Sequence, residues 1–359
     1  MGHLPIVNQE TIKNVIKSGY IATRGDLRQH IIKTTSDIFS DVLAVRKGDL
    51  IFPWIVHGES GENMGFKYVF KISGPPIFVK GDDYPVKVQL WEEGLVFENP
   101  LSEADALDLW DKKILWNAIG KKSLGRGRSL THQTPMEDQK MLELLEERNP
   151  KGPKKIILQK GKINGVPLSI NPSQRKWNNN LLKTIKNLPE KDRLKSLDLD
   201  GVPWAKEKFF AVEKTLEAWL MENIDKDSCL SLRNLLFDGS DKIIWFGNYL
   251  PFGVQGSNMD VVILHERKNN KLVITVIELK VGTINKNQFL DTCGQVIDYS
   301  NFLKKAFDSF GISVELNPVI LTGISKISSF QHIRRNNLNP KFIGYEVDSK
   351  GKVIFRRLL

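Results

Sequence analysis

The sequence of 359 residues has few of the residues that build cross-links and zinc sites. It holds only two cysteines, Cys229 and Cys293, so one disulfide is arithmetically possible but no disulfide framework is implied. No CxxC pair occurs, and the six histidines show no ligand spacing such as HExxH. A structural zinc site is therefore not expected. Any metal would be held by oxygen ligands, which favours magnesium or manganese.

Long apolar runs are also missing. No stretch approaches the roughly 18–20 consecutive apolar residues that a membrane helix needs, and the first residues, MGHLPIVNQETIKN, are too polar for a secretory signal. We therefore expect an intracellular, cytoplasmic protein without a membrane partner. A chain of 359 residues is longer than one hydrophobic core usually serves, which suggests two domains and a connector.

Acidic residues are scarce relative to basic ones, because the formal net charge is +10. Lysines and arginines that neutralise phosphates dominate nucleic-acid affinity, so the excess favours DNA, or RNA, as a partner. A well-solvated basic surface explains the same composition. Between Pro150 and Pro189 the sequence has nine Lys or Arg residues and no Asp or Glu. That segment is either a strap on phosphates or a solvated linker.

Three zones of different character follow one another. Residues 1–149 carry strand patterns in DLIFPWIVHG, MGFKYVFKIS and PVKVQLW, and the first two read as a hairpin. Helices are predicted at SEADALDLWDKKILWNAIG and at TPMEDQKMLELLEERN, the second with Thr134 as its cap and Pro135 at its first position. Residues 150–200 form the basic connector, for which we predict one hairpin, KKIILQKGKINGVPLSI, and a short helix.

Residues 201–359 follow the order helix, three strands, helix, strand. The segment AKEKFFAVEKTLEAWLMENI has apolar residues at helical spacing. The strands are KIIWFG, NMDVVILHE and KLVITVIELK, the last two joined by the polar turn RKNN, and a long helix and further strands follow. The economical arrangement is a mixed sheet flanked by helices. The predicted fold class is therefore α/β and α+β in two domains.

Two acidic residues, Asp260 and Glu278, sit on the strands that the RKNN turn joins. A hairpin would bring both carboxylates to the same end of the sheet. Because alternate side chains of a strand point the same way, Glu278 and Lys280 would project together while Leu279 enters the core. Burying two charges beside the apolar run LVITVI is costly without a partner or a metal.

This set suits metal-dependent hydrolysis of a phosphodiester. The two carboxylates, with the main-chain carbonyl of Leu279, would hold Mg²⁺ or Mn²⁺, which polarises the phosphate and lowers the pKa of a bound water. The lysine would orient that water or stabilise the developing negative charge.

The same residues resemble the PD-(D/E)xK nuclease superfamily, and within it the RecB-like branch, over residues 205–300. The matching positions are Asp260, the triplet Glu278-Leu279-Lys280, and the pair Gln295-x-x-x-Tyr299, whose members share one helix face. The resemblance implies a restriction-endonuclease-like fold and metal-dependent cleavage of DNA. It also implies that Gln295 and Tyr299 contact DNA or support the site.

The stretch EKTLEAWLMENI resembles the first helix of archaeal RecB-like mismatch-cleaving nucleases. Glu213 is the closer match to the acidic residue of that helix, and Glu217, one turn further on, is the alternative. The resemblance therefore adds one of these two glutamates to the predicted catalytic set.

The N-terminal zone has no comparable catalytic set but carries aromatic residues near its strand ends. A β-barrel core accounts for most of them, and a cage that stacks on an extruded base is the functional alternative, with Trp54 and Trp91 as its candidates. Arginines that would meet phosphates around such a cage are Arg24, Arg28, Arg126 and Arg128.

Residues 18–145 resemble the PUA-like superfamily, especially its YTH and EVE branches. The resemblance rests on GYIATRGDLRQHI, KGDLIFPWIVHGESGENMGFKYVFKI and VQLWEEGLVFENPLS. It implies a β-barrel with helices that reads modified or flipped bases.

We therefore expect a DNA endonuclease whose cutting site is chosen by a PUA-like reader, in the manner of modification-dependent restriction. A mismatch- or structure-specific repair nuclease would share the same nuclease half. A non-catalytic DNA- or RNA-binding protein would bind in a salt-dependent way without cutting. A homodimer built by the N-terminal half would let two sites cut both strands.

Overall fold

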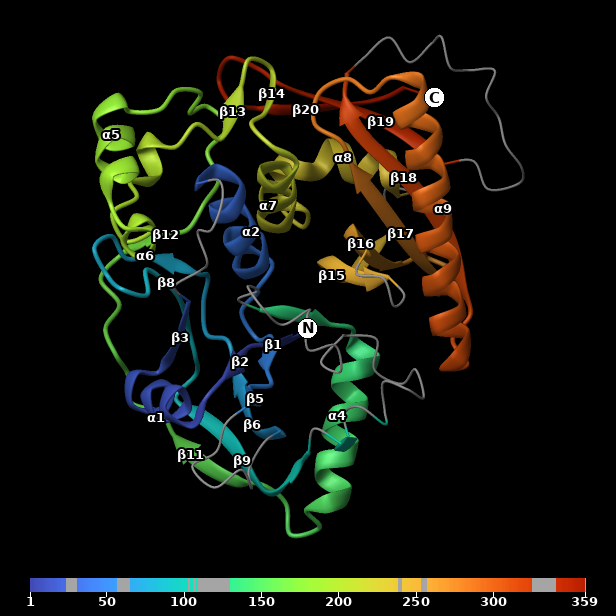
Figure 1. The fold of residues 1–359 in the computed structure, drawn as a ribbon. Coiled ribbons are helices and arrows are strands. Elements are labelled where there is room, and N and C mark those ends of the chain that lie inside the picture. Colours follow the sequence, from blue (N-terminus) through green and yellow to red (C-terminus); the bar gives the residue numbers. More distant parts are fainter. Residues whose placement is uncertain are drawn as a thin grey trace. The chain divides into compact units, whose positions relative to one another are not determined.

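The protein, described here as a computed structural model, is a mixed α/β chain (Figure 1). The structure describes residues 1–23, 31–56, 65–102, 104–105, 108, 130–237, 241–252, 257–324 and 340–358. The chain divides into two compact units, each assembled from separate stretches of sequence. The first comprises Met1–Arg28, Asp41–Leu168 and Leu188–Ser196, and the second comprises Gln29–Ser40, Ser169–Asn187 and Leu197–Leu359.

The first unit is built on two sheets of short strands. The larger sheet has the path β10-β1-β4-β6-β5-β2, with β9 paired to β6 and β11 paired to β9, and the smaller has the order β12-β7-β8-β3. Its strands are β1 (Gly2–Leu4), β2 (Ile6–Val7), β3 (Tyr20–Thr23), β4 (Leu50–Ile51), β5 (Trp54–Ile55), β6 (Gly65–Lys71), β7 (Ile77–Phe78), β8 (Val86–Gln89), β9 (Glu93–Leu101), β10 (Thr131–Gln133), β11 (Lys154–Ile157) and β12 (Val166–Pro167). Its helices are α1 (Gln9–Ser18), α4 (Pro135–Arg148) and α6 (Glu190–Arg193).

Several predictions for the N-terminal zone are confirmed. Strands β4 and β5 both pair antiparallel with β6, as the hairpin prediction required. Thr134 caps α4 in a capping box with Glu137, and Pro135 is the first residue of that helix. Most of the helix predicted from Ser102 onward lies outside the described residues.

The hairpin predicted in the connector is wrong. Its two arms, β11 and β12, pair with β9 and β7 instead of with each other. The Asn164-Gly165 dipeptide is a strong hairpin signal by itself, but the strands of the first unit offered both arms other partners. The short helix predicted for the same segment is present as α5 (Asn179–Asn187).

The second unit contains a six-stranded sheet in the order β15-β16-β17-β18-β19-β20. Its strands are β15 (Lys242–Phe252), β16 (Ser257–Glu266), β17 (Leu272–Leu279), β18 (Val314–Gly323), β19 (Lys341–Val347) and β20 (Val353–Arg357). Strands β17, β18 and β19 run parallel, and the other neighbours are antiparallel. The predicted mixed sheet is therefore confirmed.

Both faces of the sheet are covered at β17, where every residue from Val273 to Leu279 is buried. The long helix α9 (Lys286–Ser309) packs along β17 and β18 (Figure 1). It starts at Asn285, whose side chain forms a capping box with Gln288. The other helices of the unit are α2 (Ile31–Leu43, of which residues 31–40 belong here), α7 (Glu213–Asn223) and α8 (Leu230–Leu236), with 3₁₀ turns at Leu199–Gly201 and Asp227–Cys229.

The helix predicted from Ala205 begins later than expected. Residues Ala205–Lys206 and Phe209–Phe210 form a two-stranded hairpin, β13 and β14, and α7 starts only at Glu213. Glu207 lies in the turn with a φ of 53°, which a continuous right-handed helix does not allow. The two phenylalanines fitted helical spacing, but aromatic residues also favour strands, and here the strand preference prevails.

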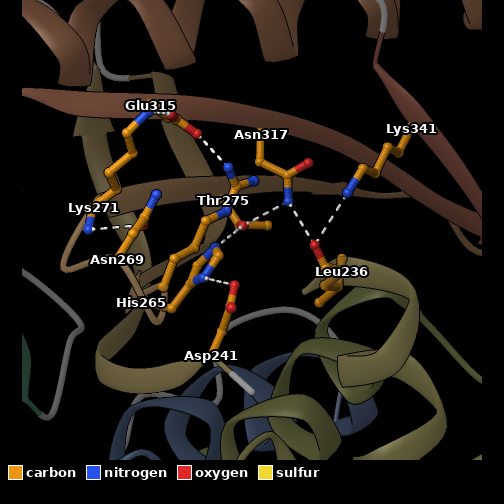
Figure 2. A network of polar contacts seen from close by, with 10 residues as sticks. Leu236, Asp241, His265, Asn269, Lys271, Thr275, Glu315, Asn317 and Lys341 are labelled. Atoms are coloured by element: carbon orange, nitrogen blue, oxygen red, sulfur yellow. Dashed lines mark hydrogen bonds and ion pairs between the residues drawn. The ribbon is translucent and has the colours of Figure 1, made fainter. Parts of the chain in front are cut away.

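A buried polar network lies at the turn end of the β16–β17 hairpin (Figure 2). His265 contacts Asp241 Oδ2 through Nδ1 at 2.9 Å and Thr275 Oγ1 through Nε2 at 3.1 Å. Asn317 Nδ2 donates to Thr275 Oγ1 at 2.8 Å and to the carbonyl of Leu236 at 3.1 Å. The network joins three strands to the end of α8.

Neither cysteine is cross-linked, and both Cys229 and Cys293 are free thiols. None of the helices in the described part of the chain has the length and apolarity that a membrane crossing needs.

Candidate functional site

The register between β16 and β17 brings Asp260 and Glu278 together. The antiparallel ladder ends at the pair Val261↔Ile277, and the next step of the same register sets Asp260 across from Glu278. Asp260 bonds to the neighbouring strand through its side chain, because Oδ2 accepts from the Leu279 N–H at 2.8 Å. The carboxylate is thereby fixed at the end of the hairpin that lies away from the turn.

Lys280 lies beside Glu278, with its Nζ 2.7 Å from Glu278 Oε1. The intervening Leu279 is fully buried, so the alternation expected along the strand is observed. The other carboxylate oxygen, Glu278 Oε2, is buried and has no hydrogen-bond partner among the described residues. A buried carboxylate oxygen without a donor is uncommon and calls for a reason.

Helix α7 contributes two glutamates to the same region. Glu213 is the first residue of α7 and is exposed. Glu217, one turn further, is buried, and it accepts from Lys214 Nζ at 2.6 Å and from Asn248 Nδ2 on β15 at 2.6 Å. Both glutamates act electrostatically on the carboxylates at the strand ends, as the pKa shifts below indicate.

Helix α9 adds Gln295 and Tyr299. Gln295 Nε2 donates to Tyr299 Oη at 2.6 Å, and the tyrosine is buried. Burial raises the pKa of Tyr299, and the charges of Glu278 and Asp260 raise it further, which locates the ring near both carboxylates. All six residues of the predicted catalytic set therefore lie in one region of the second unit.

The electrostatics of the site are dominated by crowded negative charge. Burial, and then the charges of Glu278 and Glu217, raise the pKa of Asp260 to about 8. Burial also raises the pKa of Glu278, with Lys280 opposing the shift and Glu213 adding to it. Burial alone would lower the pKa of Lys280, but the adjacent Glu278 carboxylate raises it, so Lys280 is held as a cation.

These residues fit a divalent cation in two respects. The orphaned Glu278 Oε2 is a free acceptor within the cluster. Among the described residues, the carboxylates of Glu213, Glu217, Asp260 and Glu278 also gather around the ammonium groups of Lys214 and Lys280. When all are ionised, negative charge exceeds positive charge in this cluster, and a divalent cation would offset the excess.

Across the described residues, no three His, Cys, Asp or Glu side chains are grouped so that they alone could hold a metal ion. The predicted ligand set is smaller, since it consists of two carboxylates and the Leu279 carbonyl. Water and substrate oxygens would complete such a set, which is the usual arrangement for magnesium.

The two tryptophans predicted to read a base differ in exposure. Trp54 is only 5% exposed and packs edge-on against Phe66, with ring centroids 4.8 Å apart. It belongs to the main core of the first unit, so neither face of its ring is open for stacking, which argues against the predicted role. Trp91 is 43% exposed, with Lys47 Nζ 5.6 Å from its ring centre. The predicted phosphate contacts Arg24, Arg28, Arg126 and Arg128 lie outside the described residues.

Two residues of the site were not predicted from the sequence. Lys214 follows Glu213 directly, and its charge lowers the pKa of both Asp260 and Glu278. Asn248 is a buried amide on an otherwise largely apolar strand. A polar residue inside such a strand needs a buried partner, and this was the signal that could have identified Asn248.

Comparisons with known proteins leave the family open. No family model matches the chain, and no curated protein matches it. Solved structures of proteins from Pseudomonas syringae and Pseudomonas putida each align with 40% of this chain and 99% of their own, at 12% and 15% identity, both with a TM-score of 0.28. An fdxN element excision controlling factor protein from Anabaena variabilis aligns with 36% of this chain and 93% of its own, at 20% identity and a TM-score of 0.22. Likenesses at these scores carry no argument about fold or function.

Proposed function

We propose that the protein is a metal-dependent DNA endonuclease of the PD-(D/E)xK type, close to its RecB-like branch. The observation that carries the proposal is the cluster at the strand ends, where Asp260, Glu278 and Lys280 meet with an unpaired buried carboxylate oxygen. Glutamates of α7 and the Gln295–Tyr299 pair of α9 surround it, as the sequence motif requires.

In this proposal the residues divide the work of phosphodiester hydrolysis. Asp260 and Glu278, with the Leu279 carbonyl, would hold Mg²⁺ or Mn²⁺, which supplies Lewis acidity and a bound water of lowered pKa. Lys280 is a cation because of its raised pKa, so it donates hydrogen bonds to negative charge on the phosphate instead of removing a proton from water. Glu213 or Glu217 completes the acidic set from α7.

The choice of cutting site is assigned to the first unit, as a PUA-like reader of a modified or flipped base. With Trp54 in the core, Trp91 is the remaining exposed aromatic candidate of the predicted pair. If Trp91 stacks on the target base, Trp91→Ala should reduce discrimination between modified and plain DNA more than it reduces basal cutting.

The test is a cleavage assay with Mg²⁺ or Mn²⁺ on plain, modified, mismatched and branched duplexes. Wild type should cut at least one of them, and Lys280→Ala should lower the rate by about 10²–10³-fold, the effect of losing one donor to a developing charge. Lys271→Ala removes another lysine of the same hairpin, at its exposed turn end, and serves as the matched control.

The preferred duplex identifies the role of the first unit. Preference for a modified base supports restriction, and preference for mismatched or branched DNA supports repair. If wild type cuts no substrate with either metal but binds DNA or RNA with a steep salt dependence, the nuclease proposal is wrong and the protein is a binding module.

A further inference from the structure

Glu217 is held in place by a directional chain of hydrogen bonds that ends on helix α2. Asn248 Nδ2 donates both to Glu217 Oε1 at 2.6 Å and to Ser40 Oγ at 3.1 Å. Ser40 Oγ in turn donates to the carbonyl of Asp37 at 2.9 Å, so its oxygen is left to accept from the amide. The orientation of the amide is fixed, because an ionised carboxylate only accepts hydrogen bonds.

Every member of this chain is removed from water. Glu217 is 1% exposed, Asn248 is 2% exposed and Ser40 is fully buried. In such surroundings a hydrogen bond to a carboxylate is strong, and its loss leaves a costly unpaired charge. The geometry of Glu217 therefore depends on Asn248, and the geometry of Asn248 depends on Ser40.

Two further contacts fasten α2 to α7 beside the site. The hydroxyls of Ser36 and Thr215 are 2.9 Å apart in the interior, and Asp37 Oδ1 lies 3.7 Å from Lys214 Nζ. Lys214 and Thr215 lie three and two positions before Glu217 in the first turns of α7. Residues 36 and 37 lie four and three positions before residue 40, so each of them neighbours Ser40 on the surface of α2.

We propose that Asn248 and Ser40 are positioning residues of the nuclease site, and that α2 holds Glu217 in place within the acidic set that surrounds the proposed metal ligands Asp260 and Glu278. The inference rests on the proposed function and extends it to a helix that lies outside the sequence motif. Ser40 stands 208 residues before Asn248 in the chain, so no pattern local to the motif includes it.

Substitutions at Ser40 separate positioning from packing. Ser40→Ala removes the acceptor of the Asn248 amide but fits the space and favours a helix. Ser40→Thr keeps a hydroxyl that can bond back along the helix, at the expense of an extra methyl group in a full core. Positioning predicts that the alanine variant loses function and the threonine variant retains it, whereas packing predicts the reverse order.

The measurements use the full-length protein and three readouts. They are the dissociation constant for Mn²⁺ without DNA, kcat and KM for the best duplex, and the melting temperature. We expect Ser40→Ala to weaken Mn²⁺ binding and lower kcat several-fold, with KM for DNA unchanged. Asn248→Leu should weaken Mn²⁺ binding and lower kcat, each by about 10–100-fold, the usual effect of losing a hydrogen-bonding partner that orients a metal site. Lys33→Ala, on the exposed side of α2, is the control that should change none of them.

The outcomes are distinguishable from failure of the proposed function. If wild type neither binds Mn²⁺ nor cuts DNA, the function is wrong and this inference falls with it. If wild type does both, and Ser40→Ala matches wild type while Ser40→Thr is the impaired variant, only the positioning role is overturned. The Ser40 pair decides the question even if Asn248→Leu does not fold.

Discussion

The β16–β17 hairpin carries a buried polar cluster at each end, and the two ends differ in how far their hydrogen bonds are satisfied. At the turn end, Asn317 donates to Thr275, Thr275 can donate to His265, and His265 can donate to Asp241 (Figure 2). Arg267 Nε at the same turn is buried without a partner among the described residues, but it lies outside this chain of bonds. At the other end, Glu278 Oε2 has no hydrogen-bond partner among the described residues, and raised pKa values accompany the crowded carboxylates.

This difference separates a structural network from a candidate site on a single pair of strands. A complete chain of donors and acceptors holds elements together and leaves nothing for a ligand to bind. An incomplete chain leaves repulsion between buried carboxylates, which a bound cation would reduce. Natural folds keep such exceptions where they serve a function.

The largest expected effect is at the unsatisfied end. Glu278→Gln keeps the shape of the side chain but removes a charge from the proposed metal set, so cleavage should fall by at least about 10²–10³-fold. The stability of the metal-free protein should change little, because relief of the repulsion with Glu213 offsets the lost charge pair with Lys280, whose ammonium can still donate to the amide oxygen. Cleavage rates and denaturant melts measure the two effects. Strong destabilisation with normal cleavage would mean that this end is structural.

The next effect is at the satisfied end, with the opposite pattern. Asn317→Leu deprives Thr275 of a donor in the interior and leaves the Leu236 carbonyl with Lys341 Nζ, so the free energy of unfolding should fall by about 1–3 kcal/mol. Cleavage per folded molecule should stay close to that of wild type, because the length of the β16–β17 hairpin separates Asn317 from the carboxylate cluster. Comparable losses of cleavage in this variant and in Glu278→Gln would contradict the division into a structural end and a functional end.

The satisfied end should also respond to acid. Burial lowers the pKa of His265 to about 4, so the folded state stays neutral while the unfolded state takes up a proton below about pH 6.5. The stability that this residue contributes is complete above pH 6.5 and is lost as the pH falls toward 4, by about 3 kcal/mol at most. His265→Gln should therefore lose less stability than wild type between pH 7 and pH 4.5. Denaturant melts at both values measure the difference, and identical losses in the two proteins would contradict the assignment.

The smallest effect is expected at the exposed rim of the same end. Glu315 pairs with Lys271 at 3.1 Å and also with Arg267, and all three side chains are at least 36% exposed. Solvent screens such pairs, so Glu315→Gln should change stability by less than about 1 kcal/mol and lose even that in high salt. Melts at low and high ionic strength provide the check. A large loss of stability that persists in high salt would show that Glu315 belongs to the buried network.

The strands and the carboxylate pair of the second unit were predictable because their signals are local. Apolar, β-branched runs marked β16 and β17, and the turn between them fixed their partnership, with Asn270 at a φ of 59° that asparagine tolerates well. Once that pairing is known, the meeting of Asp260 and Glu278 follows from the register alone.

The failures share a dependence on distant partners. The sequence of β11 and β12 predicted a hairpin, but β11 pairs with β9 and β12 pairs with β7. The burial of Trp54, whose role as a cage residue stays a prediction, could not be read from a strand pattern either. The role of Asn248 depends on a serine 208 residues away, so only the folded structure reveals it.

The participation of α2 in the second unit also constrains the order of events during synthesis. At roughly 5–20 residues per second, the ribosome makes Asn248 about 10–40 s after Ser40. Throughout that interval the Asn248 amide is missing beside Ser40, and until residue 204 is made the ring of Phe39, buried in the finished protein, also lacks Trp204, against which it packs. A chain arrested before β15 is complete therefore lacks the amide that holds Glu217 and cannot assemble the carboxylate cluster, and its exposed apolar side chains would make a truncated copy a target for chaperones.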